Sequence, residues 1–176
     1  MQILVTGGAG FIGSHLSEKL IADGHRVTVL DNYSTGCREN LGSVAGHANF
    51  KLVEGSVLDE SLVQVLVGAS DAVFHLAAAV GVKLIMEQPS HSILTNINGT
   101  ENVLKAAIPN KILTFIASSS EVYGKAQKIP FAEDDDLTIG ATTNLRWAYA
   151  SAKTVDEFLA LAYAREVALP VVVCRF

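Results

Sequence analysis

The sequence predicts an α/β fold, in which a doubly wound parallel sheet of about six strands carries helices on both faces. Three observations lead to this fold class. Short apolar runs alternate with helical patterns along the whole chain, which is typical of βαβ units. A glycine-rich turn directly follows the first apolar run, and a carboxylate ends the second run. The runs, the turn and the carboxylate together are typical of the first βαβ unit of such a sheet.

The predicted elements follow one another without an internal repeat or a low-complexity linker. Strands are predicted where short apolar runs occur, and helices where apolar residues recur at helical spacing. Asp23 and Gly24 form the stop signal of the first helix. Strands are expected near 2–6, 26–31, 50–54, 72–76, 112–117 and 170–175, helices near 11–22, 59–67, 90–107 and 147–167, and a turn around 38–44.

The first turn reads Thr-Gly-Gly-Ala-Gly-Phe-Ile-Gly from Thr6 to Gly13, between a strand and a helix. Gly7, Gly8 and Gly10 lack the Cβ atoms that would keep a phosphate away from the backbone. Gly13 allows the helix to pack closely on the strand. Because a helix N-terminus offers free N–H groups and a partial positive charge, this loop is predicted to bind the pyrophosphate of a dinucleotide.

A carboxylate completes this nucleotide-binding pattern. Asp31 follows Gly13 by 18 residues, close to the roughly 20 expected for an acid that binds the ribose hydroxyls. Such an acid would repel a 2′-phosphate, which favours NAD over NADP. The alternative is that Asp31 is only a turn residue at the end of a strand, and its pairing with the glycines favours the ribose role.

Composition excludes several classes of function. The chain has 176 residues, of which 49% are hydrophobic, and a formal net charge of −5. A mildly acidic chain without a basic stripe is not expected to bind nucleic acid or an anionic membrane. No apolar run approaches the roughly 20 residues that span a bilayer, and Met1 leads directly into a strand. With Cys37 and Cys174 expected as reduced thiols, the sequence predicts a cytoplasmic protein with a single domain over residues 1–176.

Metal chemistry is not expected. The five histidines are scattered along the chain without the spacing of metal ligands, and no carboxylate can be assigned as a partner to any of them. His75 ends a predicted strand, where packing or a local hydrogen bond accounts for it.

A tyrosine and a lysine open the last predicted helix. The i, i+4 spacing of Tyr149 and Lys153 places both side chains on one helical face. A phenol with a pKa of ~10 is a poor base at neutral pH unless a cation stabilises its phenolate, and Lys153 is predicted to do so. The alternative is a tyrosine that packs on the stem of the lysine, and the pair alone does not exclude it.

A cluster of hydroxyls and a carboxylate follows the predicted strand 112–117. Ligands of doubly wound sheets bind outside the carboxyl ends of the strands, so this cluster is predicted to lie beside a bound substrate. Ser119 and Glu121 are the candidates for chemistry, whereas a strand-end cap accounts for Ser118.

These motifs together resemble the extended short-chain dehydrogenase/reductase family. TGGAGFIG, Asp31, His-Leu-Ala-Ala at 75–78, SSSEVYG and YASAK occur in the order and spacing of that family, and the resemblance covers essentially all of the chain. Within the family, the chain is similar to NAD-dependent nucleotide-sugar epimerases, dehydratases and decarboxylases. The resemblance implies a Rossmann-type NAD-binding domain.

The resemblance also implies roles for individual residues. Ser119 matches the catalytic Ser/Thr, Tyr149 the acid/base, and Lys153 the residue that binds the nicotinamide ribose; Glu121 is a further catalytic candidate. Ser56 stands where the family usually has Asp, which weakens the expected hydrogen bond to adenine. The cofactor-binding residues that the resemblance implies are Gly7, Gly10, Phe11, Ile12, Gly13, Asp31, Asn32, Ser56, Val57, Leu76, Ala77, Ala78, Asn96, Tyr149 and Lys153.

The implied reaction is transient oxidation of a sugar hydroxyl, with NAD used catalytically. Tyr149 would remove the hydroxyl proton while Ser119 hydrogen-bonds the same oxygen. The ketone then permits epimerisation, elimination of water or loss of a carboxylate. A UDP-glucose 4-epimerase-like activity is the first expectation and a decarboxylase the second. A dehydratase ranks lower because Ser120-Glu121 replaces the usual Asp-Glu pair. A non-catalytic NAD-binding module is the alternative from another class.

Partners are expected from the same resemblance. The helices near 90–107 and 147–167 carry apolar residues on more than one face, and relatives pair these helices into a dimer, so a homodimer is expected. The substrate is expected to be a nucleotide sugar that is linked to UDP. Relatives build their substrate domain largely from sequence beyond the sixth strand. That domain is therefore expected to be absent from this chain, and turnover by the chain alone is expected to be low.

Overall fold

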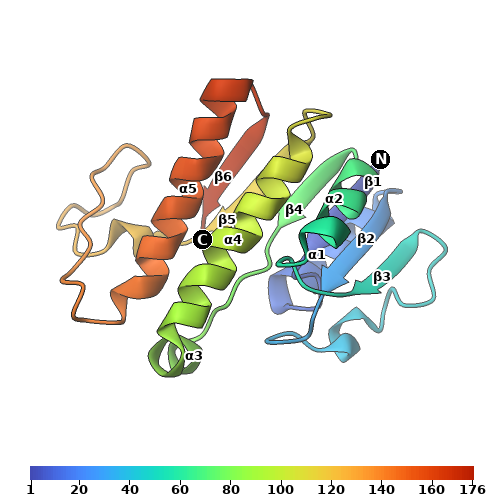
Figure 1. Ribbon diagram of the computed structural model, residues 1–176. Helices are drawn as coiled ribbons and strands as arrows, with labels where there is room; N and C mark the ends of the chain where they lie inside the picture. Colours follow the sequence, from blue (N-terminus) through green and yellow to red (C-terminus); the bar gives the residue numbers. More distant parts are fainter.

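The fold is one parallel sheet with helices packed on both faces, and the computed structural model describes residues 1–176 (Figure 1). The strands are β1 (Gln2–Thr6), β2 (Arg26–Asp31), β3 (Phe50–Glu54), β4 (Ala72–His75), β5 (Leu113–Ser118) and β6 (Val171–Arg175). The α-helices are α1 (Phe11–Ala22), α2 (Glu60–Gly68), α3 (Val82–Glu87), α4 (Pro89–Ala107) and α5 (Trp147–Val167), with 3₁₀ turns η1 (Arg38–Leu41) and η2 (Ser120–Tyr123).

The strand order confirms the predicted doubly wound sheet. All neighbours pair in parallel in the order β3-β2-β1-β4-β5-β6, so the order reverses between β1 and β4. A crevice opens at such a reversal, outside the carboxyl ends of the strands. The topology therefore directs the loops after β1, β2, β4 and β5 toward one place.

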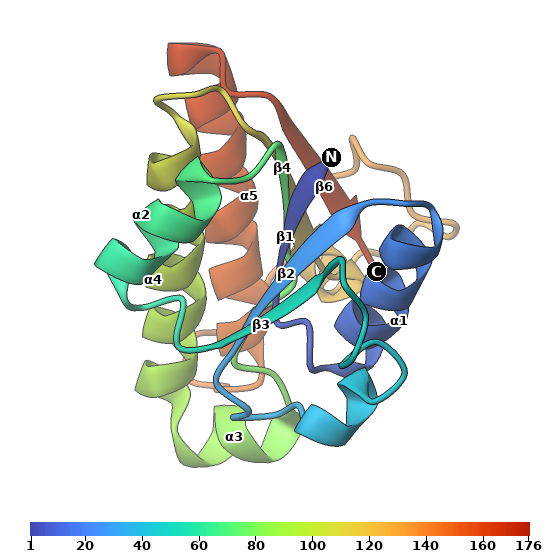
Figure 2. The same cartoon turned by 90° about the vertical axis from the view of Figure 1, so that its right-hand side faces the viewer.

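Two apolar cores hold the layers together. In Figure 2 the helices α2, α4 and α5 cover one face of the sheet, and α1 covers the other. Leu4, Val103 and Ile116 belong to the core under the first layer. Val5 and Val29 belong to the core on the α1 side. Successive residues of β1 thus point to opposite faces, as burial of the sheet on both sides requires.

The predicted elements agree with the structure to within about two residues, and two short elements were not predicted. The predicted helix 59–67 begins one residue later, because the Asp59 carboxylate caps it by accepting a hydrogen bond from Leu62 N at 3.0 Å. Helix α3 follows Gly81, whose φ is +110°. Only six residues long, α3 is too short to show helical periodicity, and η2 spans only four residues.

Candidate active site

A cleft of about 500 Å³ runs along the carboxyl ends of the strands. Every sequence-predicted site residue lines this cleft except Gly8, Asn96 and Glu121. The glycine loop after β1, the end of β2, the segment after β4, the end of β5 and the start of α5 all contribute to its wall. Residues more than 140 positions apart in the chain therefore share one cavity, as the sheet topology requires.

The glycine loop is built so that side chains would not fit. Gly7 has a φ of +71°, and a Cβ on it would lie 2.6 Å from the backbone nitrogen of Ala77. A Cβ on Gly13 would lie 2.3 Å from the carbonyl oxygen of Gly7. Gly10 is the N-cap of α1, and no side chain caps that helix end. The first N–H groups of α1 are thus left free at the cleft, as an anion-binding helix N-terminus requires.

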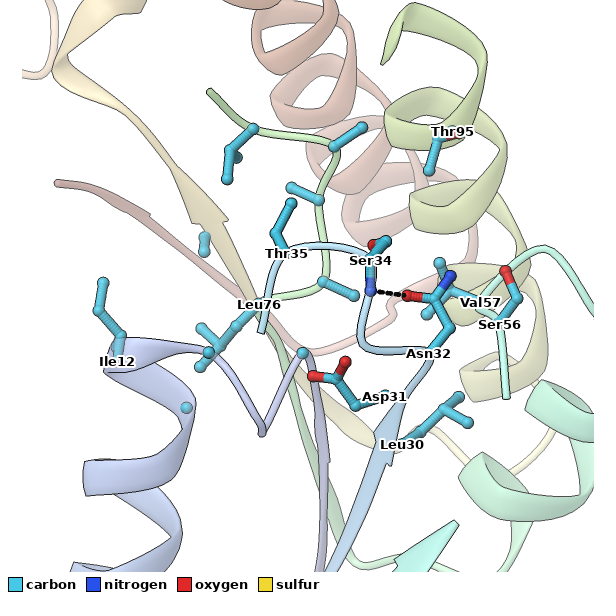
Figure 3. A pocket seen from close by; sticks show the side chains of 18 of the residues that line it. Ile12, Leu30, Asp31, Asn32, Ser34, Thr35, Ser56, Val57, Leu76 and Thr95 are labelled. Atoms are coloured by element: carbon cyan, nitrogen blue, oxygen red, sulfur yellow. Dashed lines mark hydrogen bonds between the residues drawn. The ribbon is translucent and has the colours of Figure 1, made fainter. Parts of the chain in front are cut away.

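The carboxylate of Asp31 is fixed at the end of β2. One oxygen, Oδ2, accepts a hydrogen bond from Ala9 N at 2.8 Å, and the other, Oδ1, accepts one from Tyr33 N at 2.8 Å. Figure 3 shows Asp31 between the strand end and the following loop, where Asn32 accepts a hydrogen bond from Ser34 N. The acid therefore ties the glycine loop to the end of β2 and lines the cleft.

The sequence interpretation missed several residues of the cleft wall. Ser34 and Thr35 reach it from the loop after β2, and Thr95 reaches it from α4 (Figure 3). The Oγ1 atom of Thr95 is buried and has no hydrogen-bond partner. A buried hydroxyl without a partner on the wall of a cleft is a group that a bound ligand can satisfy. Only the rotation of α4 decides this placement, so no local motif could have indicated it.

Asn96 is not among the residues that line the cleft, and its part in cofactor binding stays a prediction. Its side chain is buried, and its Oδ1 accepts a hydrogen bond from Ala79 N at 2.6 Å. Ser92 Oγ donates a hydrogen bond to the carbonyl oxygen of Ala79 at 3.1 Å. Helix α4 thus uses these two side chains to hold the segment after β4, and the residues just before Ala79 line the cleft.

Ser119, Tyr149 and Lys153 all line the cleft. The Ser119 oxygen caps η2 by accepting a hydrogen bond from Glu121 N at 3.3 Å, which leaves its proton free to donate. Glu121 itself is exposed and does not line the cleft. Its negative charge nevertheless helps to raise the pKa of Tyr149, in addition to the larger effect of burial.

The pKa of Tyr149 is raised, contrary to the sequence expectation. Burial is the main cause, and the charges of Glu121 and Asp156 add to it. Lys153 is almost fully buried, and its Nζ lies 3.2 Å from Oδ2 of Asp156. Because this carboxylate offsets the ammonium charge, the lysine alone does not lower the pKa of the phenol.

The end of β5 is held by a partly buried ion pair between Arg175 and Glu157. Ser118 Oγ donates to Glu157, and Arg175 donates to both Glu157 oxygens, with Nε–Oε1 and Nη2–Oε2 distances of 2.9 and 2.7 Å. Burial opposes ionisation of Glu157, but the hydrogen bonds from Arg175 and Ser118 outweigh it and lower the pKa of the carboxyl group. Ser118 is therefore the strand-end cap that the sequence indicated.

The structure contains no group of three or more His, Cys, Asp or Glu side chains arranged to hold a metal ion. None of its helices combines the length and the hydropathy that crossing a lipid bilayer would require.

Curated proteins similar to this chain act on nucleotide sugars. A UDP-N-acetyl-alpha-D-glucosaminuronate decarboxylase from Bacillus cytotoxicus is 47% identical over 99% of this chain and 53% of its own length. UDP-glucuronic acid decarboxylase 1 from Danio rerio is 37% identical over 99% of this chain and 40% of its own. The chain thus spans about half the length of the curated relatives it matches.

Solved structures share the fold and confirm the resemblance. A dTDP-glucose 4,6-dehydratase from Streptomyces venezuelae, solved with NAD bound, superposes with a TM-score of 0.90 at 32% identity and covers 99% of this chain and 55% of that one. A UDP-glucose 4-epimerase from Thermotoga maritima, solved with UDP-glucose, superposes with a TM-score of 0.87 at 34% identity. It too covers 99% of this chain and 55% of its own. A family model described as GDP-mannose 4,6 dehydratase matches residues 4–176, and the chain therefore belongs to that family.

Proposed function

We propose that this chain is the cofactor-binding part of an NAD-dependent nucleotide-sugar decarboxylase that acts on a UDP-linked sugar acid. The observation that carries the proposal is the 47% identity to a UDP-N-acetyl-alpha-D-glucosaminuronate decarboxylase over nearly the whole chain. This identity ranks the decarboxylase above the epimerase, which the sequence alone placed first.

The cleft fits NAD in its shape and its charges. A Cβ on Gly7 or Gly13 would collide with backbone, and the uncapped N-terminus of α1 offers N–H donors to a pyrophosphate. Asp31 offers acceptors to ribose hydroxyls. The orphaned hydroxyl of Thr95 and the ammonium of Lys153 are further polar groups toward such a ligand. These residues would hold the cofactor, and the chemistry that bound NAD supplies is reversible acceptance of a hydride.

The side chains at the other end of the cleft supply proton transfer. Tyr149 takes the proton of a sugar hydroxyl, and Ser119 donates a hydrogen bond to the same oxygen. Oxidation at the carbon next to the one that bears the carboxylate gives a β-keto acid. The bond to the carboxyl carbon then breaks, CO₂ leaves, and the electron pair passes to the ketone oxygen as an enolate. Loss of CO₂ needs no additional protein base. Protonation of the enolate carbon and return of the hydride to the ketone carbon would then give the pentose.

The test is incubation of the full-length protein with NAD and, in separate assays, UDP-N-acetylglucosaminuronate or UDP-glucose. We expect CO₂ and the corresponding pentose product from the sugar acid. Products are identified by mass and NMR. Conversion of the neutral sugar to its epimer without CO₂ release would instead support the epimerase.

The Tyr149→Phe variant tests whether the site is catalytic. It removes the proton acceptor but keeps the ring, so turnover should fall by about 10²–10⁴-fold while NAD affinity changes little. Unchanged turnover would contradict the proposed role of the phenol. Binding of NAD without turnover of any sugar by the unaltered protein would support the non-catalytic module.

The second candidate, an epimerase, is supported by the likeness to the UDP-glucose 4-epimerase from Thermotoga maritima. Both reactions begin with the same oxidation, so the residues of this chain serve either. They differ in what the ketone does next, which depends on the substrate.

We further propose that the protein is a homodimer through α4 and α5. These helices carry the exposed apolar side chains Leu94, Phe158 and Leu161, and a groove of about 340 Å³ lies between them. The groove is lined mainly by apolar residues that include Ile97 and Val155. A second copy of these helices would remove this surface from water.

A further inference from the structure

A buried carboxylate stands behind the lysine of the cleft. Asp156 has 0% exposure and Lys153 has 2%, and their Oδ2 and Nζ atoms lie 3.2 Å apart. Lys153 lines the cleft, whereas Asp156 does not. The other carboxylate oxygen, Oδ1, has no hydrogen-bond partner. Because a buried ion pair gains little or no stability over apolar packing, the pair calls for a different explanation.

The pair continues into a chain of buried polar groups under the cleft. Burial raises the pKa of Asp156 overall, and Thr100, which lies beside its carboxylate, acts in the opposite direction. The Thr100 Oγ1 lies 3.2 Å from His75 Nε2, and His75 Nδ1 lies 2.8 Å from Thr6 Oγ1. Ala77 N donates to Thr6 Oγ1 at 3.3 Å.

One arrangement of protons accounts for all these contacts. Burial and the charge of Lys153 lower the pKa of His75 to about 3, so the ring is neutral. Thr6 accepts from Ala77 N and can donate to Nδ1, so Nε2–H donates to Thr100. The hydroxyl proton of Thr100 is then free to turn toward the carboxylate. The chain thus links the segment that lines the middle of the cleft to Asp156 and Lys153 at its end.

The charged groups that face Tyr149 come from two elements. Helix α5 supplies Asp156 and also carries Lys153, one helical turn along from Tyr149, and η2 supplies Glu121. Both carboxylates raise the pKa of the phenol, with burial as the main cause. Glu157, the next residue along α5, acts on Asp156 but is itself paired with Arg175.

We propose that Asp156 is a positioning residue, which fixes the Lys153 ammonium at the wall of the cleft and sets the net charge that Tyr149 experiences. The inference deepens the proposed function, on which it relies for the role of Tyr149. Asp156 does not line the cleft. It acts on the reaction by fixing Lys153 and by the charge that it adds near Tyr149.

The experiment is a spectroscopic titration of Tyr149 in the full-length protein without cofactor or substrate. The tyrosinate absorbance of each protein is measured against its own Tyr149→Phe counterpart, so that only Tyr149 contributes to the difference. In Asp156→Asn the lysine charge is no longer offset. The midpoint should therefore move to lower pH by about one pH unit.

The matched control is Glu157→Gln, which removes the neighbouring buried carboxylate of the same helix. It should leave the Tyr149 midpoint within a few tenths of a pH unit, because the charge of Glu157 is held by Arg175. A structural role for Asp156 alone predicts loss of stability without a change of midpoint. An unchanged or higher midpoint in folded Asp156→Asn would overturn the proposal.

A double variant keeps the proposal testable if Asp156→Asn does not fold. Lys153→Met/Asp156→Asn has no unpaired buried charge, and its midpoint must lie below that of Lys153→Met alone. Equal midpoints would overturn the proposal. Because no sugar is present, the titration does not depend on the proposed decarboxylase function. If the midpoint shifts but the protein shows no decarboxylase activity, only the proposed function is overturned.

Discussion

A single side chain, His75, shows how burial decides the chemistry of a titratable group. It ends β4 and is fully enclosed, and hydrogen bonds to Thr6 and Thr100 satisfy both ring nitrogens. The sequence indicated packing or a local hydrogen bond for this residue, and the structure confirms that interpretation. Burial and the nearby Lys153 charge lower its pKa from 6.5 to about 3.

The lowered pKa of His75 makes stability depend on pH. Below pH 6.5 the unfolded chain binds a proton at this residue, whereas the folded chain resists protonation until about pH 3. The free energy of unfolding should therefore fall as the pH drops through this window, by up to about 1.4 kcal/mol per pH unit from this residue.

The measurement is urea unfolding of the protein and of His75→Asn between pH 7 and about pH 4.5. The difference between the two free energies of unfolding should shrink as the pH falls, because only the unaltered chain has this titration. His47→Asn, at an exposed position, is the control and should keep the full pH dependence. Parallel curves for the protein and His75→Asn would contradict the assignment of a neutral buried ring.

How far sequence could predict the site depends on whether the signal is local. The glycine loop and Asp31 lie in one strand–turn–helix–strand segment, so spacing alone placed them on the cleft. Thr95 and Asn96 are neighbours on a helix, about 100° apart around its axis. Which of the two faces the cleft depends on the rotation of α4 against the sheet, and nothing local encodes that rotation.

The pKa of Tyr149 could have been predicted more closely from the sequence. Asp156 lies three residues after Lys153, a spacing at which opposite charges meet on a helix. The sequence interpretation treated the lysine charge as free. The two residues are buried together, so that the carboxylate of Asp156 offsets the charge of Lys153. Only the structure could show this burial, because it depends on how α5 packs against α4.

The helices α4 and α5 carry apolar residues both on the side that packs on the sheet and on the opposite, exposed side. Their inner sides pack on the sheet through residues such as Val103, Leu104 and Ala160. Their outer sides expose Leu94, Phe158 and Leu161, so that a second apolar surface follows the same two helices. A helix that packs on a sheet alone would show one apolar stripe, and the second stripe is the basis of the proposed dimer.

A charge on the outer side of α5 should break the proposed dimer. Phe158→Glu places a carboxylate at a position with 69% exposure, where a second copy would bury it unpaired. We expect the sedimentation coefficient to fall from that of a dimer to that of a monomer at micromolar concentration. Val65→Glu on α2, at 68% exposure, is the matched control and should leave association unchanged. A monomeric unaltered protein would contradict the proposed homodimer.

In the molecule as a whole, the cleft is made by the sheet rather than by any one loop. Its walls come from both halves of the sheet, which meet where the strand order reverses between β1 and β4. Helices cover both faces, and each face has its own apolar core (Figure 2). Residues 1–176 therefore contain every group that we assign to cofactor binding.

Residues 1–176 alone should bind NAD and prefer it to NADP. A ligand that binds only the folded state stabilises it by about 2.7 kcal/mol at a concentration of 100 Kd, so NAD should raise the unfolding temperature. NADP should raise it less, because its 2′-phosphate would meet the Asp31 carboxylate, whose oxygens are fixed by Ala9 N and Tyr33 N. Thermal unfolding with each nucleotide measures the preference, and Asp31→Asn should reduce it by removing the negative charge. Equal stabilisation by both nucleotides would contradict the ribose role of Asp31, whereas a preference retained in Asp31→Asn would assign it to another residue.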